Sequence, residues 1–144
     1  MNRKGQALVV AQFVLIVLVI AGGPWLPRGV VGRMLVGIGG VAGFWAILAM
    51  RQSRLRVFPD VAEGAHLVEA GPYRWIRHPM YSSGLLIMLG FVIDQPSPLR
   101  IIAWLGLAVV LLAKMRLEEQ YLRAAFPDYA AYEARTWRLI PGVF

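Results

Sequence analysis

The sequence has 144 residues, of which 58% are hydrophobic and 16% are charged, and its mean hydropathy is +0.60. Soluble domains contain about 45–50% apolar and about 25% charged residues, so this composition indicates an integral membrane protein of one domain. The absence of cysteine excludes disulfides and zinc–thiolate sites, and two histidines make a histidine-rich metal site unfavourable. The formal charge of +7 fits anionic lipid better than nucleic acid in so apolar a chain.

Two apolar stretches near the N-terminus predict membrane-spanning helices. Residues 5–23 carry no charge and have the length of a span, roughly 20 residues. The basic residues before this stretch resemble the start of a signal peptide, but the apolar run is too long for one, and we interpret it as a first helix. A second helix is expected over residues 34–50, where four glycines would let helices approach closely.

The remaining elements follow a polar loop, residues 51–77, which prolines and glycines break and which cannot span a membrane. Residues 79–93 and 98–125 predict a helical hairpin around a turn with two prolines and Asp94. The second helix of the hairpin is expected to become amphipathic after Lys114 and to end before Pro127, and a short helix is expected over residues 129–137. The predicted fold class is therefore an all-α integral membrane protein with about four transmembrane helices and a C-terminal amphipathic segment.

Basic residues are distributed unequally between the two sides that four spans define. Twelve of the 15 basic residues lie on the side of the termini and the polar loop, which predicts that both termini and this loop are cytoplasmic. The twelve are Arg3, Lys4, Arg51, Arg54, Arg56, Arg74, Arg77, Lys114, Arg116, Arg123, Arg135 and Arg138, against Arg28, Arg33 and Arg100 on the other side.

Residues 71–81 form the first candidate site, with the sequence Gly-Pro-Tyr-Arg-Trp-Ile-Arg-His-Pro-Met-Tyr. His78 precedes a proline and is pushed toward extended geometry, while Pro79 suits the first position of a helix. Arg77 and His78 then lie just outside a helix N-terminus, which favours an anionic group. The alternative is an interfacial anchor, with the aromatic residues in the headgroup belt and the arginines on lipid phosphates.

Glu118 and Glu119 form the second candidate site. Two adjacent carboxylates at a membrane surface would hold a cationic group such as an ammonium. The alternative is local pairing on the helix, because Lys114 lies four residues before Glu118 and Arg123 lies four residues after Glu119. The tail, with Tyr129, Tyr132, Arg135, Arg138 and Pro141, would by itself indicate a segment lying on the lipid headgroups.

Together these segments resemble the isoprenylcysteine carboxyl methyltransferase family and its phospholipid methyltransferase relatives. The family pattern is Arg-His-Pro-x-Tyr, a hydrophobic stretch and Glu-Glu, and here it reads Arg77 to Tyr81 and Glu118-Glu119. The resemblance covers residues 67–141 of the single domain 1–144. A Gly-x-Gly element, present before the histidine segment of eukaryotic phospholipid methyltransferases, is missing from the loop, which favours the isoprenylcysteine type.

The resemblance implies S-adenosylmethionine as cofactor, bound at the cytoplasmic face under the C-terminal segment, and a lipophilic acceptor. Arg77 and His78 would hold the cofactor's carboxylate, and Glu118 or Glu119 its ammonium. The implied cofactor-binding residues are Tyr73, Arg77, His78, Pro79, Tyr81, Glu118, Glu119, Tyr129 and Tyr132, and the implied catalytic residues are Arg77, His78, Glu118 and Arg138.

Several alternatives stay open at this stage. The acceptor would be a carboxylate, or an amine as in phospholipid N-methylation, or a phenol or thiol. A membrane NADPH-dependent reductase and a non-catalytic scaffold are the rival functions. A transporter of charged substrates is disfavoured, because Arg33, Asp94 and Arg100 lie at the ends of the spans and their interior looks free of ionisable groups. No metal or nucleic acid is expected, and the oligomeric state is open.

Overall fold

A computed structural model describes residues 3–21, 23–51 and 67–144. Its helices are α1 (Arg3–Ile20), α2 (Val30–Arg51), α3 (Pro79–Asp94), α4 (Pro98–Ala125) and α5 (Tyr129–Arg135), with a 3-10 turn η1 (Gly71–Arg74). These ranges contain no β-strand, which confirms the all-α fold class. Most of the predicted polar loop, residues 52–66, lies outside the described residues.

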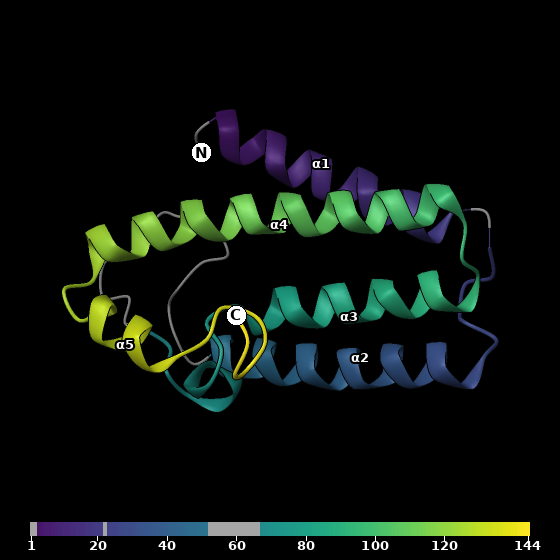
Figure 1. Cartoon of the computed structure of the whole chain (residues 1–144). Helices are drawn as coiled ribbons and strands as arrows, with labels where there is room; N and C mark the ends of the chain where they lie inside the picture. The colour runs from purple at the N-terminus through teal and green to yellow at the C-terminus, as the bar shows by residue number, and fades with distance from the viewer. Residues whose placement is uncertain (1–2, 22, 52–66) are drawn as a thin grey trace.

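The helices pack as two pairs, with α1 beside α4 and α2 beside α3 (Figure 1). Successive long helices run in opposite directions. The start of α1, the end of α2, the start of α3 and the end of α4 therefore lie toward the same end of the bundle. The turn η1, helix α5 and the C-terminal tail gather at this end, next to the start of α3 (Figure 1). The Arg-His-Pro-x-Tyr segment and the two adjacent glutamates consequently meet at this end.

Three helices have the length and hydropathy of membrane spans: α1, α2 and α4. Helix α3 is equally apolar but has only 16 residues, fewer than the roughly 20 that a span along the bilayer normal needs. The distribution of side chains is that of a membrane protein, because large apolar residues such as Phe13, Val41 and Val109 are exposed while Glu119 is completely buried.

Helix boundaries agree with the sequence most closely where a proline marks them. Helices α3 and α4 begin at Pro79 and Pro98, as predicted, and the Ser97 hydroxyl caps α4 by accepting a hydrogen bond from the Arg100 amide at 3.3 Å. Helix α1 ends at Ile20 instead of residue 23, and α2 begins at Val30 instead of residue 34. Apolar composition sets these two boundaries only loosely, because a helix can continue into the interface or stop short of it.

Glycines make the close contact between α2 and α3. A Cβ on Gly39 would come within 2.9 Å of the Ser83 carbonyl oxygen, and a Cβ on Gly90 would come within 2.7 Å of the Gly32 carbonyl oxygen. Gly37 and Gly40, by contrast, have nothing within 4 Å of a Cβ and face outward. The predicted packing role is therefore confirmed for one face of α2 only.

Candidate functional site

The C-terminal tail, residues 136–144 after α5, is hydrogen-bonded to the segment that precedes α3. Ile76 and Trp137 form an isolated parallel bridge, in which the Arg77 amide donates to the Trp137 carbonyl at 2.7 Å and the Trp137 amide donates to the Trp75 carbonyl at 2.9 Å. The Ser82 hydroxyl adds a hydrogen bond to the Leu139 carbonyl at 2.7 Å. Backbone hydrogen bonding thus brings the tail against the Arg-His-Pro segment, far away in sequence.

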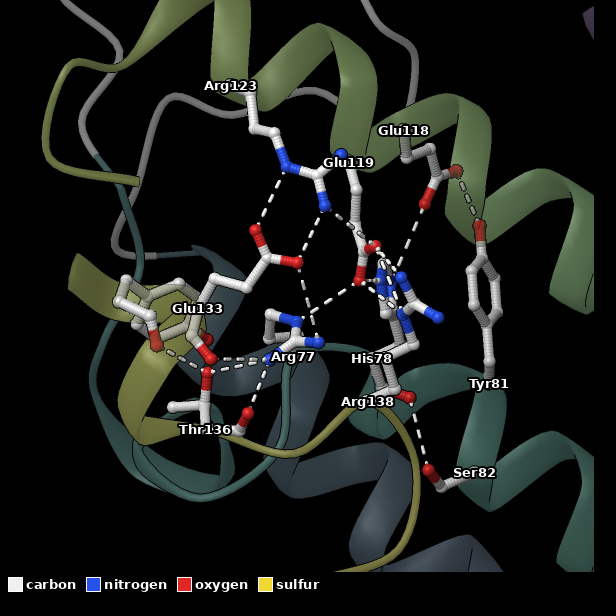
Figure 2. Close-up of polar contacts among 11 residues, drawn as sticks. Arg77, His78, Tyr81, Ser82, Glu118, Glu119, Arg123, Glu133, Thr136 and Arg138 are labelled. Carbon is white, nitrogen blue, oxygen red and sulfur yellow. Dashed lines mark hydrogen bonds and ion pairs between the residues drawn. The ribbon is translucent and has the colours of Figure 1, made fainter. Parts of the chain in front are cut away.

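Glu119 lies at the centre of a cluster of charged side chains, which we call the Glu119 cluster (Figure 2). Its side chain is fully buried, and burial of a carboxylate is tolerated only when it is paired. The partners come from three segments: Arg77 Nε at 3.1 Å, His78 Nε2 at 3.3 Å, Arg138 Nη2 at 2.8 Å and Arg123 Nη2 at 3.7 Å. The charge on Glu119 therefore holds α4, the start of α3 and the tail together.

Arg77 also donates hydrogen bonds to backbone carbonyl oxygens of the protein. Its Nη1 donates to the carbonyl oxygens of Glu133 and Thr136, the former at 3.0 Å. Its side chain is only 8% exposed. In this arrangement the guanidinium positions α5 and the tail, and it has little surface with which to meet a ligand.

His78 lies between the two glutamates. Its Nε2 is 3.3 Å from Glu119 Oε1, and its Nδ1 is 3.8 Å from Glu118 Oε2. Its ring is stacked with that of Tyr81 at 5.6 Å, and the Tyr81 hydroxyl donates to Glu118 Oε1 at 2.6 Å. The adjacent glutamates therefore approach one imidazole from two sides, although successive residues on a helix point about 100° apart.

The two glutamates differ in their accessibility. Glu119 is closed off by four cationic or imidazole partners, whereas the Glu118 side chain is 24% exposed. The local pairing on α4 that the sequence offered as an alternative is present for Glu119, which has Arg123 at 3.7 Å. Glu118 and Lys114 form no ion pair, because Lys114 donates to Gln12 of α1 at 3.2 Å and the Glu118 carboxylate accepts from the Tyr81 hydroxyl. Packing between helices overrides the weak surface pair here.

Besides Tyr81, three buried tyrosines lie at this end of the bundle: Tyr73, Tyr129 and Tyr132. The Tyr132 hydroxyl donates to the Tyr73 carbonyl at 2.7 Å and fastens α5 to η1. The Tyr129 hydroxyl is the one buried side-chain polar atom among the described residues without a hydrogen-bond partner. Burial raises the pKa of Tyr129, so this hydroxyl stays neutral and able to donate.

The rim of the Glu119 cluster is formed by Glu133 of α5. Arg123 Nε and Nη2 donate to its two carboxylate oxygens at 2.9 and 2.6 Å. This hydrogen bonding lowers the pKa of Glu133 below its usual value. On the other side of the cluster, the hydrogen bond to Glu119 raises the pKa of Arg138.

The structure thus places every predicted site residue at one end of the bundle, and it adds four that sequence reasoning did not single out as site residues: Glu133, Thr136, Ser82 and Arg123. Arg123 had a signal, because it lies one helical turn after Glu119. The other three act through their contacts with distant segments, which no local spacing reveals. In the described ranges, no three histidine, aspartate or glutamate side chains are grouped so as to hold a metal ion.

Comparison with known proteins identifies the family of this arrangement. The family model described as phospholipid methyltransferase matches residues 27–129. The cobalt-zinc-cadmium resistance protein CzcN of Cupriavidus metallidurans is 32% identical over 97% of this chain, and the nickel-cobalt-cadmium resistance protein NccN of Alcaligenes xylosoxydans is 26% identical over 97%. The chain spans 64% and 65% of the length of these two relatives.

An uncharacterized protein of Schizosaccharomyces pombe is 36% identical over 49% of this chain and 22% of its own length. The matched family residues include the Arg-His-Pro-x-Tyr segment, both glutamates and the start of α5. They also include α2, α3 and α4, the helices that bring these residues together. The protein is therefore a membrane-embedded member of the phospholipid methyltransferase family.

Proposed function

We propose that the protein is an S-adenosylmethionine-dependent methyltransferase that acts on a lipophilic acceptor at the end of the bundle where η1, α5 and the tail meet. The observation that carries this proposal is the convergence of both glutamates on His78, at 3.3 and 3.8 Å. His78 and Glu119, which lie 41 positions apart in the sequence, meet here together with the tail. They form a polar end of a bundle whose spans are largely apolar. Family membership supplies the reaction class.

The residues present suit the cofactor. Its sulfonium supplies an already activated methyl group, so the protein has mainly to align the two reactants and exclude water. Of the two adjacent glutamates, Glu118 is the one with exposed surface, and it would hold the ammonium group. Arg138, whose side chain is 26% exposed, would hold the carboxylate. Arg77 and Glu119 are positioning residues in this proposal.

The chemistry of the acceptor decides which protein groups it needs. A carboxylate acceptor, as in the isoprenylcysteine type that we favour, is already a nucleophile and needs no base. An amine acceptor, as in phospholipid N-methylation, must first lose its proton, and Glu118 or His78 would accept it. The buried and part-buried carboxylates beside His78 are compatible with either acceptor.

We place this end of the bundle at the cytoplasmic face. The basic residues that are described there include Arg3, Lys4, Arg116 and Arg135, and the positive-inside rule orients such an end toward the cytoplasm. The cofactor would then be drawn from the cytoplasm and the acceptor from the inner leaflet.

The names of the relatives suggest a physiological setting. One relative is named for resistance to cobalt, zinc and cadmium, and another for resistance to nickel, cobalt and cadmium. The chain has no cysteine, and its described residues hold no metal-ligand cluster. We therefore propose that a role in metal tolerance would come from methylating a membrane component, and not from binding the metal.

The test is direct binding of S-adenosylmethionine and S-adenosylhomocysteine to the detergent-purified protein by calorimetry, with NADPH as the competing candidate. We expect both sulfur ligands to bind, and His78→Ala and Glu118→Gln each to weaken binding by about tenfold or more. Glu69→Gln is the matched control, because it removes an exposed acid at the same end of the bundle, which pairs only with Arg135 among the described residues. Thermal unfolding of each variant shows whether it is folded.

Three results would contradict the proposal. Binding of NADPH alone would favour the reductase, and the absence of binding to a folded sample would favour the scaffold. Equal weakening by Glu69→Gln and Glu118→Gln would show that binding depends on general charge and not on the proposed site.

A further inference from the structure

The segment that runs from η1 to the start of α3 divides its side chains between two surfaces. Tyr73 and His78 are buried, at 5% and 7% exposure, and belong to the candidate site. Arg74 and Trp75, which follow Tyr73 directly, are exposed instead, and Trp75 keeps 46% of its surface. These two residues therefore lie outside the candidate site, and their contacts have to be explained separately.

Trp75 packs against α2 through a second tryptophan. The rings of Trp75 and Trp45 meet edge-on, with centroids 5.9 Å apart and an interplanar angle of 62°. Gly71 lets η1 come this close, because a Cβ there would lie 3.2 Å from Trp45 Nε1. The Arg74 guanidinium carbon lies 4.7 Å from the centre of the Trp75 ring, within the range of a cation–π contact. We call the side chains of Trp45, Arg74 and Trp75 the tryptophan patch.

The charge of Arg74 has no counter-charge within the described part of the chain. None of the ion pairs there includes Arg74, and the Trp75 ring beside it is a neutral partner. The patch thus combines a positive charge with two half-exposed indoles, each of which joins a large apolar ring to an N–H donor. This combination fits a surface that offers anionic groups next to hydrocarbon, as the headgroup layer of a bilayer does.

The position of the patch points to the same layer. Trp45 belongs to α2, which has the length and hydropathy of a membrane span, and it lies about 9 Å from the end of that helix at Arg51. The α2 side chains next to it in sequence include Phe44 and Leu48, which are apolar and 62% and 42% exposed. The patch therefore continues the lipid-facing surface of α2 toward the end of the span. Tryptophans are enriched at that level of a membrane, and arginines there extend toward the headgroups.

We propose that Trp45, Arg74 and Trp75 form a contact surface for the headgroup layer of a bilayer that contains anionic lipid. The two indoles lie between headgroups and hydrocarbon, and Arg74 pairs with the anionic groups of the surface. The partner is the bulk bilayer and not the methyl acceptor, so the inference does not depend on the proposed reaction. Its consequence is positional, because fixing η1 at the membrane surface sets the depth at which the adjoining candidate site lies.

The experiment measures the depth of η1 in vesicles of phosphatidylcholine and phosphatidylglycerol. Because the chain has no cysteine, Ala70→Cys provides a unique attachment point for a nitroxide next to the patch. The measured quantity is the accessibility of the nitroxide to oxygen, which enters the hydrocarbon, and to a water-soluble nickel chelate.

Two further labelled positions calibrate this scale. Val41→Cys lies at a 72% exposed position in the middle of α2 and gives the value for hydrocarbon. Ala125→Cys gives the value for water, because α4 is about 42 Å long and extends beyond a hydrocarbon core of about 30 Å. We expect the nitroxide at position 70 to give a value between these two.

Variants of the patch test which side chains hold η1 at this depth. Arg74→Gln combined with Trp75→Ala should raise the accessibility of position 70 to the nickel chelate by about twofold or more, because both contacts with the headgroups are lost. Arg74→Gln alone should remove the difference between vesicles with and without phosphatidylglycerol, and it serves as the test if the double variant does not fold. Arg116→Gln removes an exposed arginine from the same end of the bundle and should change nothing.

Three results would overturn the inference. A value at position 70 equal to that at position 125 would place η1 in water. Protection of position 70 from both oxygen and the nickel chelate would show that protein, such as a second copy of this chain, covers the patch. Equal responses to Arg74→Gln and Arg116→Gln would reduce the effect to overall charge.

Binding of S-adenosylhomocysteine in detergent keeps this inference separate from the proposed function. Arg74→Gln should bind it as the unmodified protein does, and loss of binding would assign Arg74 to the cofactor site and overturn the inference. Failure of the unmodified protein to bind would remove the methyltransferase proposal, while an intermediate depth of position 70 that depends on Arg74 and Trp75 would still support the membrane contact.

Discussion

The two ends of the helix bundle both bury charge, but they do so in different ways. At the end opposite the tail, Arg100 is 5% exposed and donates to the carbonyl oxygens of Gln95, at 3.2 Å, and Ile20, at 3.5 Å. The neighbouring Asp94 accepts a hydrogen bond from the Gly29 amide. These contacts tie helix ends and the turns next to them. No described side chain of opposite charge is paired with Arg100.

At the end with the tail, charged side chains from distant segments meet one another. Glu119 is paired with arginines from the start of α3 and from the tail, and beside it Glu118 keeps exposed surface. A buried charge is therefore not enough to indicate a ligand site in this molecule. Two features distinguish the end with the tail from the opposite end. The ion pairs around Glu119 form a closed network that holds the segments together, and the adjacent carboxylate of Glu118 stays partly exposed.

The largest expected effect is that of Glu119→Gln. Removing this charge leaves Arg77 and Arg138 buried or part-buried without their shared partner, and breaking a buried pair in this way typically costs about 3–5 kcal/mol. We expect a large fall in the unfolding temperature in detergent, together with loss of S-adenosylhomocysteine binding. Glu133→Gln, at the exposed rim of the same cluster, serves as the control. A Glu119→Gln variant as stable as this control would show that the network does not hold the tail.

A change at the opposite end should separate stability from binding. Arg100→Met keeps a long apolar side chain but removes the hydrogen bonds to Gln95 and Ile20, at an expected cost of about 1–3 kcal/mol for the carbonyl groups left behind. The unfolding temperature should fall while the affinity for S-adenosylhomocysteine of the folded protein stays the same. A matched loss of affinity would mean that the two ends are coupled, and the comparison between them would fail.

Between the two ends, the α2–α3 contact offers a matched pair of glycines. Gly39→Ala would place a Cβ within 2.9 Å of a carbonyl oxygen of α3 and 2.7 Å from Ile87 Cγ1, and such overpacking costs about 1–3 kcal/mol. Gly37→Ala adds the same group where nothing lies within 4 Å and should be neutral or slightly stabilising, because alanine favours the helix. Thermal unfolding of the two variants measures the difference. Equal effects would show that α2 and α3 do not approach closely at Gly39.

Much of this architecture can be predicted from the sequence, because prolines and long apolar runs act locally. Pro79 and Pro98 set the start of α3 and α4, and the apolar runs locate the spans. The gathering of the site at one end also follows from the alternation of four helices. The division of labour between Glu118 and Glu119 does not follow, since it depends on how the tail docks at Trp137 and how Tyr81 packs against α4.

The smallest expected effect concerns Glu133, at the edge of the Glu119 cluster. Because hydrogen bonding to Arg123 lowers the pKa of Glu133 in the folded protein, its contribution to stability is present above the unfolded pKa of about 4.3 and is lost as the pH falls through the lower folded value. The unfolding temperature of the unmodified protein should therefore fall more steeply with acidification below this range than that of Glu133→Gln. Parallel curves for the two proteins would show that the Arg123 pair adds no stability. Since the Glu133 side chain is 27% exposed, solvent screening keeps this effect well below that of Glu119→Gln. The difference in stability loss between the Glu133→Gln and Glu119→Gln variants therefore measures how far burial strengthens the ion pairs of the cluster.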